Sequence, residues 1–501
     1  VDSDRDRFWT GFWNGYSSFE NTTISSNGVL TAGTVNRPVQ SNTEYVKAYS
    51  DFISTAIGGT WFKDDWTISA EFSSTRSESQ SVQDFIRFQT ADKYKVDFDL
   101  LAGDNVPDVS FGGADLTSPE GLNLTILFDF TVQKETTDDA FKIDFTRELD
   151  GDFFTAIDFG GRYNSIETNS RETHKDVRPN FALTDLSDIS RLYSNNDFFS
   201  GDGPSVNNSY LVADKSVWTG CETLSEYYNA DQQAECAEGF EKPRSYNIQE
   251  DITALYVQAD YETEVGDKYI SGNFGVRYVN RELNTNGLTI DTATGETTPY
   301  NIDVSNTEFL PSAVMKLDWS DELVYRFGAA RVLTFPNTAN LTNGLLIRGN
   351  NTADLGNAQL DPFIINQLDA SVEWYFDESA ILSAGLFYKD VESFIVKTVR
   401  AVEVAGYDKD VTVSQAVNGE GGKIKGVELL YQQPFTFLPS FLQDTGIMAT
   451  YSFIDSETPI EDANGNALPI PGLSENNINL VAYYEVDDLG FRLAYNWRDE
   501  Y

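Results

Sequence analysis

The residue types that perform covalent chemistry are scarce in this sequence. Histidine occurs once, at His174, so the chain has no His-Glu-x-x-His zinc site, and a Ser-His-Asp triad would require that one residue. The run Gly421-Gly422-Lys423 resembles part of a phosphate-binding loop, but Ile424 stands where that loop needs Ser or Thr. The 79 Asp and Glu residues are too numerous for an acid–base pair to be singled out. The sequence therefore predicts that the protein is not an enzyme and has no catalytic residues.

The two cysteines, Cys221 and Cys236, both lie in one polar stretch of the chain. Their closeness in a sequence otherwise free of Cys predicts a local disulfide formed in an oxidising compartment. A bridge that closes a loop of this size would stabilise the fold by roughly 3 kcal/mol. Two free thiols are the alternative, and a cysteine-based metal site is not expected.

Two short segments carry oxygen atoms at spacings suited to Ca²⁺. They are Asp2-x-Asp4-x-Asp6 and Asp462-x-Asn464-Gly465-Asn466. Neither is followed by the bidentate Glu of a complete calcium loop. We interpret both as polar loop tips and expect no metal site and no cofactor.

Aromatic residues in polar surroundings are the best candidates for contacting a ligand. Such rings stack on a sugar face or on an aromatic siderophore while neighbouring Asn and Asp supply hydrogen bonds. The candidates are Trp9, Trp13, Tyr16, Trp218, Tyr227 and Tyr228. The alternative is that these rings pack the loops together or form an aromatic girdle.

The charge balance excludes one class of partner. The chain has 35 basic and 79 acidic residues, a formal net charge of −44. The phosphates of nucleic acid would be repelled by such a protein, so no nucleic-acid partner is expected. No run approaches the 18 or so apolar residues of a membrane-spanning helix, so any membrane-spanning form would have to be a β-barrel.

Apolar and polar residues alternate along much of the chain. Between Asn366 and Phe376 the apolar Leu368, Val372 and Trp374 occupy one face of a strand, and polar residues occupy the other. A polar turn at residues 377–379 leads into a second alternating run, so residues 366–389 read as a hairpin of two long strands. Similar pairs of alternating runs occur elsewhere in the chain. Together they predict about sixteen strands of roughly 9–14 residues, long enough for tilted bilayer crossings.

The connections between these strands alternate in length. Short turns follow Tyr261, Leu317, Phe376 and Val486. Long polar loops follow Tyr163, Leu283, Leu333, Ile395 and Ile454. Short turns on one rim and long loops on the other are typical of an outer-membrane barrel, whose long loops lie outside the cell. The first fifty residues read as an extended loop or an irregular hairpin, and a short strand is expected near residues 93–101.

The fold class expected is therefore all-β, an antiparallel transmembrane β-barrel. In a soluble β-sandwich or β-propeller, apolar and polar residues also alternate along each strand, and the polar face of the sheet lies in water. A sandwich of this size would need far shorter strands, which favours the barrel. The alternative function that goes with a soluble fold is a secreted all-β glycan-binding or glycan-degrading protein.

Several sequence blocks resemble those of one family in the same order. They are NFGVRYVNRELN at 273–284, the block at 309–337, the hairpin block at 356–395, NGEGGKIKGVELLYQQPFTFLP at 418–439, and the blocks from PIPGLSENN to the end. Together they resemble the barrel of TonB-dependent outer-membrane receptors, especially the proteobacterial branch linked to carbohydrate uptake. The chain differs from that family at Phe335-Pro336, where Arg-Pro is usual.

The resemblance implies a function and a set of partners. We expect residues 1–501 to be the barrel portion of a roughly 22-stranded receptor, with a long extracellular loop at about 164–247. The sequence shows no plug-like segment, energy-coupling box, signal peptide or terminal closing strand, so a fragment cut at both ends is expected. The resemblance implies a receptor in the outer membrane of a Gram-negative bacterium. It would contact outer-membrane lipid and import a scarce nutrient with energy from the TonB complex, acting through the missing plug. The ligand implied is a carbohydrate rather than a ferric siderophore.

Overall fold

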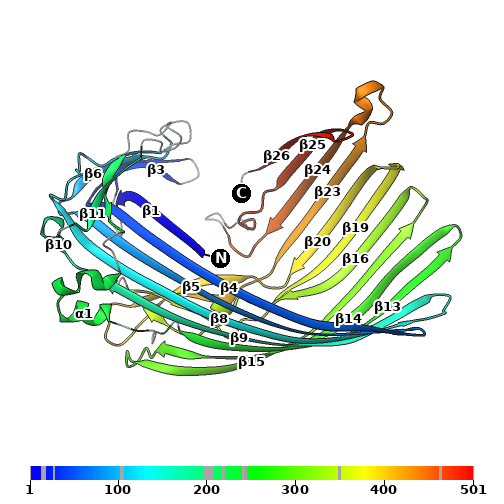
Figure 1. The fold of residues 1–501 in the computed structure, drawn as a ribbon, viewed down its shortest axis with the longest axis horizontal. Helices are drawn as coiled ribbons and strands as arrows, with labels where there is room; N and C mark the ends of the chain where they lie inside the picture. Colours follow the sequence, from blue (N-terminus) through cyan, green and yellow to red (C-terminus); the bar gives the residue numbers. More distant parts are fainter. Residues whose placement is uncertain are drawn as a thin grey trace. The chain divides into compact units, whose positions relative to one another are not determined.

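The computed structural model consists almost entirely of antiparallel strands. It describes residues 2–12, 19–25, 29–101, 107–186, 188–195, 208–215, 220–237, 239, 243, 245–347, 351–461, 465 and 467–499. A single sheet of 16 strands follows the chain in the order β1-β4-β5-β8-β9-β13-β14-β15-β16-β19-β20-β23-β24-β25-β26, with β10 paired to β8 (Figure 1). The all-β class and the approximate number of strands are confirmed.

The strands of this sheet are longer than expected. Their bounds are β1 (Asp2–Phe12), β4 (Val39–Lys63), β5 (Trp66–Thr90), β8 (Leu122–Glu148), β9 (Phe154–Val177), β10 (Phe181–Ala182), β13 (Tyr246–Val265), β14 (Lys268–Ile290), β15 (Thr297–Asp318), β16 (Leu323–Thr334), β19 (Phe363–Asp377), β20 (Ala380–Val391), β23 (Gly422–Pro434), β24 (Thr445–Glu457), β25 (Asn476–Val486) and β26 (Leu489–Arg498). The longest has 27 residues, because several strands continue well beyond their apolar stretch. The expected range of 9–14 residues was too short for these strands.

Smaller elements fill the connections. They are β2 (Glu20–Ile24), β3 (Leu30–Arg37), β6 (Tyr94–Asp99), β7 (Asp108–Ser110), η1 (Leu183–Asp185), β11 (Ser190–Ser194), β12 (Ser209–Ala213), η3 (Cys221–Tyr227), α1 (Ala230–Cys236), η4 (Thr338–Asn340), β17 (Leu346–Ile347), β18 (Thr352–Leu355), β21 (Ile395–Val402), β22 (Val411–Asn418) and η5 (Ser440–Asp444). Among the described residues, no helix is long and apolar enough to cross a membrane.

The chain divides into two compact units. Unit 1 comprises residues 1–52, 77–135 and 169–245, and unit 2 comprises residues 53–76, 136–168 and 246–501. Strands β4, β5, β8 and β9 contribute residues to both units.

Unit 1 has a core like that of a water-soluble domain. Its fully buried side chains include Phe88, Val96, Leu122, Leu124 and Val212, from strands far apart in the sequence. A four-stranded sheet of order β2-β3-β6-β7 and the hairpin β11-β12 also belong to this unit. The first fifty residues were expected to be loop or irregular hairpin, and they instead form β1 to β4.

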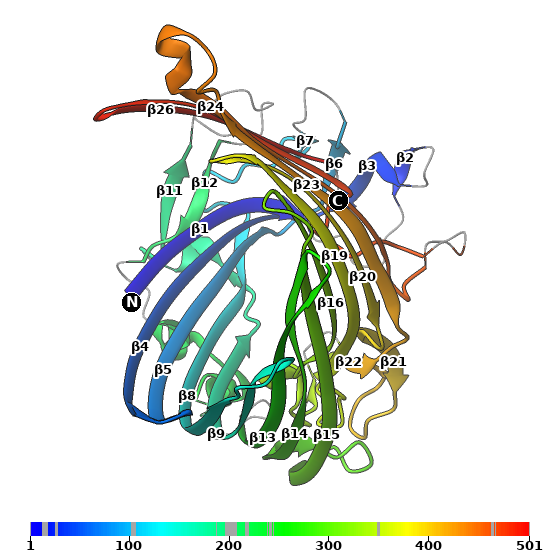
Figure 2. The ribbon, with the colours of Figure 1, turned by 90° about the vertical axis from the view of Figure 1, so that its right-hand side faces the viewer.

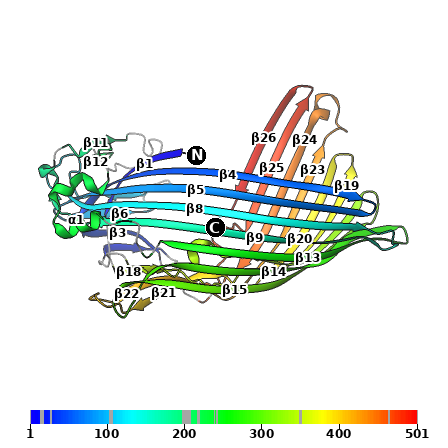
Figure 3. The same ribbon diagram turned by 60° about the horizontal axis from the view of Figure 1, so that its bottom comes forward.

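Unit 2 contains the regular hairpins. Strands β13, β14 and β15 run side by side over 20 or more residues each (Figure 3). The turn between β13 and β14 begins at Gly266, whose φ of +69° suits glycine because a side chain would be strained there. Two-residue turns also join β19 to β20 and β25 to β26. The expected alternation of short turns and long connections is present, except at two places where a loop was expected: β9 continues through residues 164–177, and β14 continues through residues 284–290.

Candidate functional site

The two faces of the unit 2 sheet differ in chemistry. One face of β13 and β14 carries Leu255, Val257, Phe274 and Val276, which are 55%, 49%, 45% and 39% exposed. The register continues this face to Phe309 on β15, beside Tyr278, and we call it the outer face. Large apolar side chains exposed in strand after strand are typical of a surface that meets lipid.

The opposite face, which we call the inner face, carries polar groups. The hydroxyl of Tyr256 donates to the Asp144 carboxylate at 2.9 Å, and the Gln258 amide donates to Asp260 at 3.1 Å. Further along the sheet, the Arg326 guanidinium donates to Glu373 through Nε at 2.9 Å. An apolar outer face and a polar inner face define a membrane-spanning β-barrel wall, whose inner face lines the path that a solute would take.

A buried ion pair lies on the inner face where β13 and β14 approach their long connections. Arg281 is fully buried, its Nε donates to Glu250 at 2.7 Å, and its Nη2 lies 2.5 Å from the same carboxylate. The guanidinium also lies over the ring of Phe335, 4.9 Å from its centroid. Within the described residues, Nη1 of Arg281 has no hydrogen-bond partner. A buried charge with incomplete partners is expensive, so this pair depends on the packing that covers it.

Two long connections pack together against this part of the wall. The β16–β19 connection supplies β17 and β18, the β20–β23 connection supplies β21 and β22, and the four strands pair in the order β17-β18-β22-β21. The two connections are joined by the parallel pairing of β18 with β22. We call this small sheet the loop sheet; β21 and β22 lie side by side in Figure 2.

Apolar contacts attach the loop sheet to the wall. Ile248 and Leu283 of the wall form one buried cluster with Leu341, Leu360 and Ala416 of the two connections. The main-chain N–H of Asp361 also donates to the Asn418 side chain at 2.9 Å, which ties one connection to the other. This sheet was not predicted, although the alternating Val411 and Val413, both buried, were a signal for β22.

The predicted ligand-contacting aromatics fall into three groups. Trp9 on β1 is 40% exposed and Tyr227 in η3 is 44% exposed, so both rings are accessible. Tyr228 is buried, donates its hydroxyl to the Cys221 carbonyl at 2.9 Å and stacks against Phe181. Trp13, Tyr16 and Trp218 lie outside the described residues. The contacts of Tyr228 match the packing alternative rather than a ligand-stacking role.

The cysteines close a short helical segment in unit 1. Cys221 begins η3, Cys236 ends α1, and the structure joins them in a disulfide across 15 residues. Asn229 caps α1, since its side chain accepts from the Gln232 N–H and the Gln232 side chain accepts in return from Asn229. The strand β9 continues to Val177, so the connection before β13 is shorter than the 164–247 expected for the loop.

The first of the two segments with a calcium-like spacing, Asp2-x-Asp4-x-Asp6, lies on β1 and has a lysine partner. The ammonium group of Lys215 donates to Asp4 at 2.7 Å and to Asp6 at 2.9 Å. These carboxylates therefore already have a cationic partner within unit 1. Of the second segment, residues 462–464 and 466 lie outside the described residues.

A cluster of carboxylates in unit 1 surrounds one lysine. Lys175 donates to Glu222 at 2.8 Å and lies 3.7 Å from Asp129. Burial raises the pKa of Asp84 to about 7, and the negative charges of Asp129 and Glu222 add to the effect while Lys175 opposes it. This carboxyl lies in the part of β5 that belongs to unit 1, beyond the apolar stretch of the strand.

A pH dependence follows from the raised pKa of Asp84. Because the folded-state pKa exceeds the value of about 3.9 in an unfolded chain, the stabilisation is complete below pH 4 and is lost as the pH rises through 7. We expect amide hydrogen exchange in residues 77–90, corrected for the intrinsic rate, to show several-fold greater protection at pH 5 than at pH 8. The variant Asp84→Asn should make protection nearly independent of pH, and Asp92→Asn, an exposed control, should not. If amide protection in Asp84→Asn kept the same pH dependence as in the unsubstituted protein, the raised pKa of Asp84 would not be its cause.

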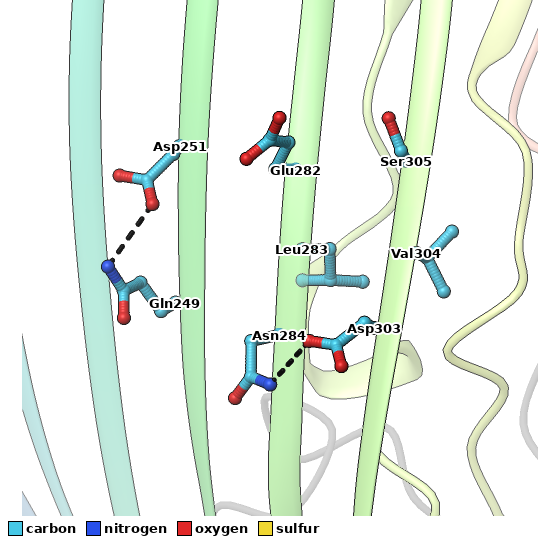
Figure 4. A pocket seen from close by; sticks show the side chains of 8 residues that line it. All are labelled: Gln249, Asp251, Glu282, Leu283, Asn284, Asp303, Val304 and Ser305. Carbon is cyan, nitrogen blue, oxygen red and sulfur yellow. Dashed lines mark hydrogen bonds between the residues drawn. The ribbon is translucent and has the colours of Figure 1, made fainter.

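A polar hollow of unit 2 lies on the outer face. It has a volume of about 370 Å³ and is lined by side chains from β13, β14 and β15 (Figure 4). The side chains of Glu282 and Asn284 alternate with the inward-facing Leu283, so they share the outer face with Phe274 and Val276. This hollow therefore faces away from the inner face and is not part of the path for an imported solute.

Comparison with known proteins agrees with a barrel that spans the membrane. The family profile described as TonB dependent receptor-like, beta-barrel, matches residues 78–501. No curated protein sequence matches the chain. The chain therefore belongs to the β-barrel family of TonB-dependent receptors.

Solved structures to which the chain is similar include three receptors. The alcaligin receptor FauA from Bordetella pertussis shares 11% identity and a TM-score of 0.39, over 95% of this chain and 67% of that one. The ferric-catecholate receptor Fiu from E. coli K12 shares 11% identity and a TM-score of 0.46, over 97% and 69%. The siderophore receptor PiuA from Acinetobacter baumannii shares 13% identity and a TM-score of 0.45, over 99% and 69%.

Family membership settles the class and the compartment. The protein is a nutrient-import receptor of the Gram-negative outer membrane, and it is a transporter rather than an enzyme. The expectation of a transmembrane barrel from this family is confirmed. The soluble glycan-binding alternative conflicts with the family and with the exposed apolar outer face, where Leu493 is 75% exposed.

Proposed function

We propose that this receptor imports a carbohydrate, rather than a ferric siderophore, with energy supplied through TonB to a plug domain. The observation that carries the proposal is the charge of the chain, −44 overall. Many ferric siderophore complexes are anionic, and a strongly acidic receptor would lower their local concentration. A neutral oligosaccharide experiences no such repulsion.

The chemistry of the inner face is consistent with a hydroxyl-rich ligand. Carboxylates such as Asp144 and Glu373 accept hydrogen bonds, and amides such as Gln258 both donate and accept. Sugar hydroxyls offer both functions at many positions. A wall lined by such groups would let a sugar exchange one partner for the next without a large desolvation cost.

The accessible rings of unit 1 would supply the stacking surfaces. Trp9 lies beside Phe85, with ring centroids 5.6 Å apart, and still keeps 40% of its surface exposed. Tyr227 is exposed to a similar extent. A ring held by a neighbour and open on one side is suited to stacking on a pyranose face.

The test is uptake by cells that carry the complete receptor. Labelled oligosaccharides should accumulate only when both the receptor and TonB are present. Trp9→Ala should raise the half-saturating concentration about fivefold, corresponding to roughly 1 kcal/mol of lost stacking. Trp319→Ala, which removes an exposed ring beside the short turn between β15 and β16, is the matched control and should leave uptake unchanged. Receptor-dependent accumulation of a ferric siderophore, with none of any oligosaccharide, would refute the proposal.

A further inference from the structure

The buried guanidinium of Arg281 has an unpaired donor on the inner face. Both of its contacts with Glu250 go to one oxygen, since Nε donates to Oε1 at 2.7 Å and Nη2 lies 2.5 Å from the same atom. Nη1 is buried and has no hydrogen-bond partner among the described residues. A buried donor that has left water without finding an acceptor is rare in folded proteins and calls for an explanation.

The next strand of the sheet carries an unpaired acceptor. Asn306 on β15 is the register partner of Arg281 on β14, so the two side chains lie on the same face. The Nδ2 atom of Asn306 donates to Asp361 at 3.5 Å. Its Oδ1 atom is buried and has no partner in the part of the chain that the structure describes. One hydroxyl group would match both unpaired atoms, because its oxygen accepts from Nη1 and its proton is donated to Oδ1.

The charges around these two atoms favour a neutral ligand. Glu250 already balances the charge of the Arg281 guanidinium. Asp361 contacts the Asn306 amide, and Glu308 lies two positions further along the same face of β15. A carboxylate or phosphate ligand would be repelled by these carboxylates, whereas a hydroxyl carries no charge. The chemistry recognised is therefore a hydroxyl group, which either a sugar or a water molecule could supply.

One aromatic ring lies over the guanidinium of Arg281. It is that of Phe335, with its centroid 4.9 Å away. Phe335 is only half-buried and is the first residue after β16. The turn that follows is held by bonds within itself, since the N–H groups of Ala339 and Asn340 donate to the side chain and the carbonyl of Asn337, both at 2.9 Å. A rotation of the Phe335 ring into solvent would leave these bonds in place.

We propose that Arg281 and Asn306 form a binding site for a sugar hydroxyl and that the Phe335 ring is its lid. The proposal rests on the proposed import of a carbohydrate and names residues that would hold it. Both residues lie away from the two-residue turn between β13 and β14, so the site is at the extracellular end of the inner face. A bound sugar gains the two hydrogen bonds that the closed site leaves unmade. The ring and the sugar compete for the same guanidinium.

Uptake by cells that carry the complete receptor tests the binding site. The probes are labelled di- to hexasaccharides released from starch, cellulose and xylan. Asn306→Leu removes the acceptor at little change in size and should raise the half-saturating concentration about tenfold. Asn301→Leu is the matched control, because it makes the same substitution on the outer face of the same strand, and it should change nothing.

The lid is tested by removing the ring and by observing it. Phe335→Ala should lower the half-saturating concentration about threefold, because a closed state no longer competes with the sugar. A merely structural ring would give the opposite change. Fluorine NMR of the receptor with fluorophenylalanine at position 335 should show the signal move toward its solvent-exposed position when the imported oligosaccharide is added. The same signal should not move in Asn306→Leu.

Three outcomes would overturn the proposal. Equal half-saturating concentrations in Asn306→Leu and Asn301→Leu would show that the unpaired atoms hold a water molecule only. A raised half-saturating concentration in Phe335→Ala would show that the ring supports the site instead of closing it. A fluorine signal that ignores the sugar would show that the ring is no lid. If Asn306→Leu does not reach the membrane, the direction of change in Phe335→Ala decides alone.

Failure of this proposal can be told apart from failure of the proposed function. The unsubstituted receptor would then still accumulate an oligosaccharide, and only the effects of the variants would be missing. Accumulation of a ferric siderophore alone by the unsubstituted receptor would refute carbohydrate import itself, and this site with it.

Discussion

Glu250→Ala is expected to destabilise the contact between the wall and the loop sheet by about 3–5 kcal/mol. Arg281 is fully buried, and the Glu250 carboxylate is its only charged partner among the described residues. Without that carboxylate the guanidinium would stay buried with no counter-charge, which costs far more than the loss of a surface pair. Hydrogen exchange of the β21 and β22 amides should rise by at least a hundredfold.

Two further variants separate this explanation from a general loss of stability. Combining Glu250→Ala with Arg281→Met removes both charges, so most of the lost protection should return. Glu485→Ala breaks a cross-strand pair with Arg492 whose side chains are 52% and 72% exposed, and it should cost less than about 1 kcal/mol. If Glu250→Ala and Glu485→Ala raised hydrogen exchange of the β21 and β22 amides equally, the destabilisation would not come from a buried charge without a partner.

Leu386→Arg is expected to destabilise the receptor in the membrane by about 2–4 kcal/mol. Leu386 is 59% exposed and lies at the middle of β20 on the outer face, where an arginine would meet hydrocarbon. The matched control is Ser383→Arg on the inner face of the same strand, opposite Glu373. That arginine would lie in a polar environment and should be tolerated. Denaturant unfolding of the receptor in lipid vesicles measures the free energy of unfolding of both variants. An equal loss of stability in the two variants would show that the two faces of the strand do not differ in environment.

The hairpins of unit 2 could be predicted because each strand alternates cleanly between lipid and polar surroundings. The faces expected for β19 and β20 are those in the structure, with Leu368 and Leu386 on the exposed apolar side. The turns were also predictable, since residues such as Gly266 stand where the backbone needs a positive φ. In these strands the alternation of apolar and polar residues matches the alternation of lipid and polar surroundings, so the sequence alone predicts which face each residue occupies.

The short strand expected near residues 93–101 is present in unit 1 as β6, but the unit 1 part of β4 escaped prediction because both of its faces are covered. Residues 39–45 of β4 are all buried, including Gln40, Asn42 and Glu44, so no alternation in polarity remains to be read. The loop sheet escaped for a different reason. Its central parallel pair joins β18 to β22 across nearly sixty residues, and nothing local specifies that partnership. The buried pair Glu250–Arg281 was likewise not predictable, because Phe335, which lies over the Arg281 guanidinium, is distant in the chain.

The ligand-contacting role of the aromatic residues stays a prediction. Accessible aromatic side chains are present at Trp9 and Tyr227, whereas Tyr228 is a packing residue. From the sequence alone the two kinds cannot be distinguished, because the burial of Tyr228 depends on Phe181, which is distant in the chain.

Spin labels along β25 in reconstituted membranes test the central claim, that this sheet is a barrel wall with one face in lipid. Single labels would be placed at positions 478 to 484 of the complete receptor, and their accessibility to oxygen and to a water-soluble nickel reagent would be measured. We expect a period of two, with Ile478, Leu480, Ala482 and Tyr484 open to oxygen and the intervening positions open to the nickel reagent. Equal access of the nickel reagent to all seven positions would contradict the account, because it would place both faces of the sheet in water.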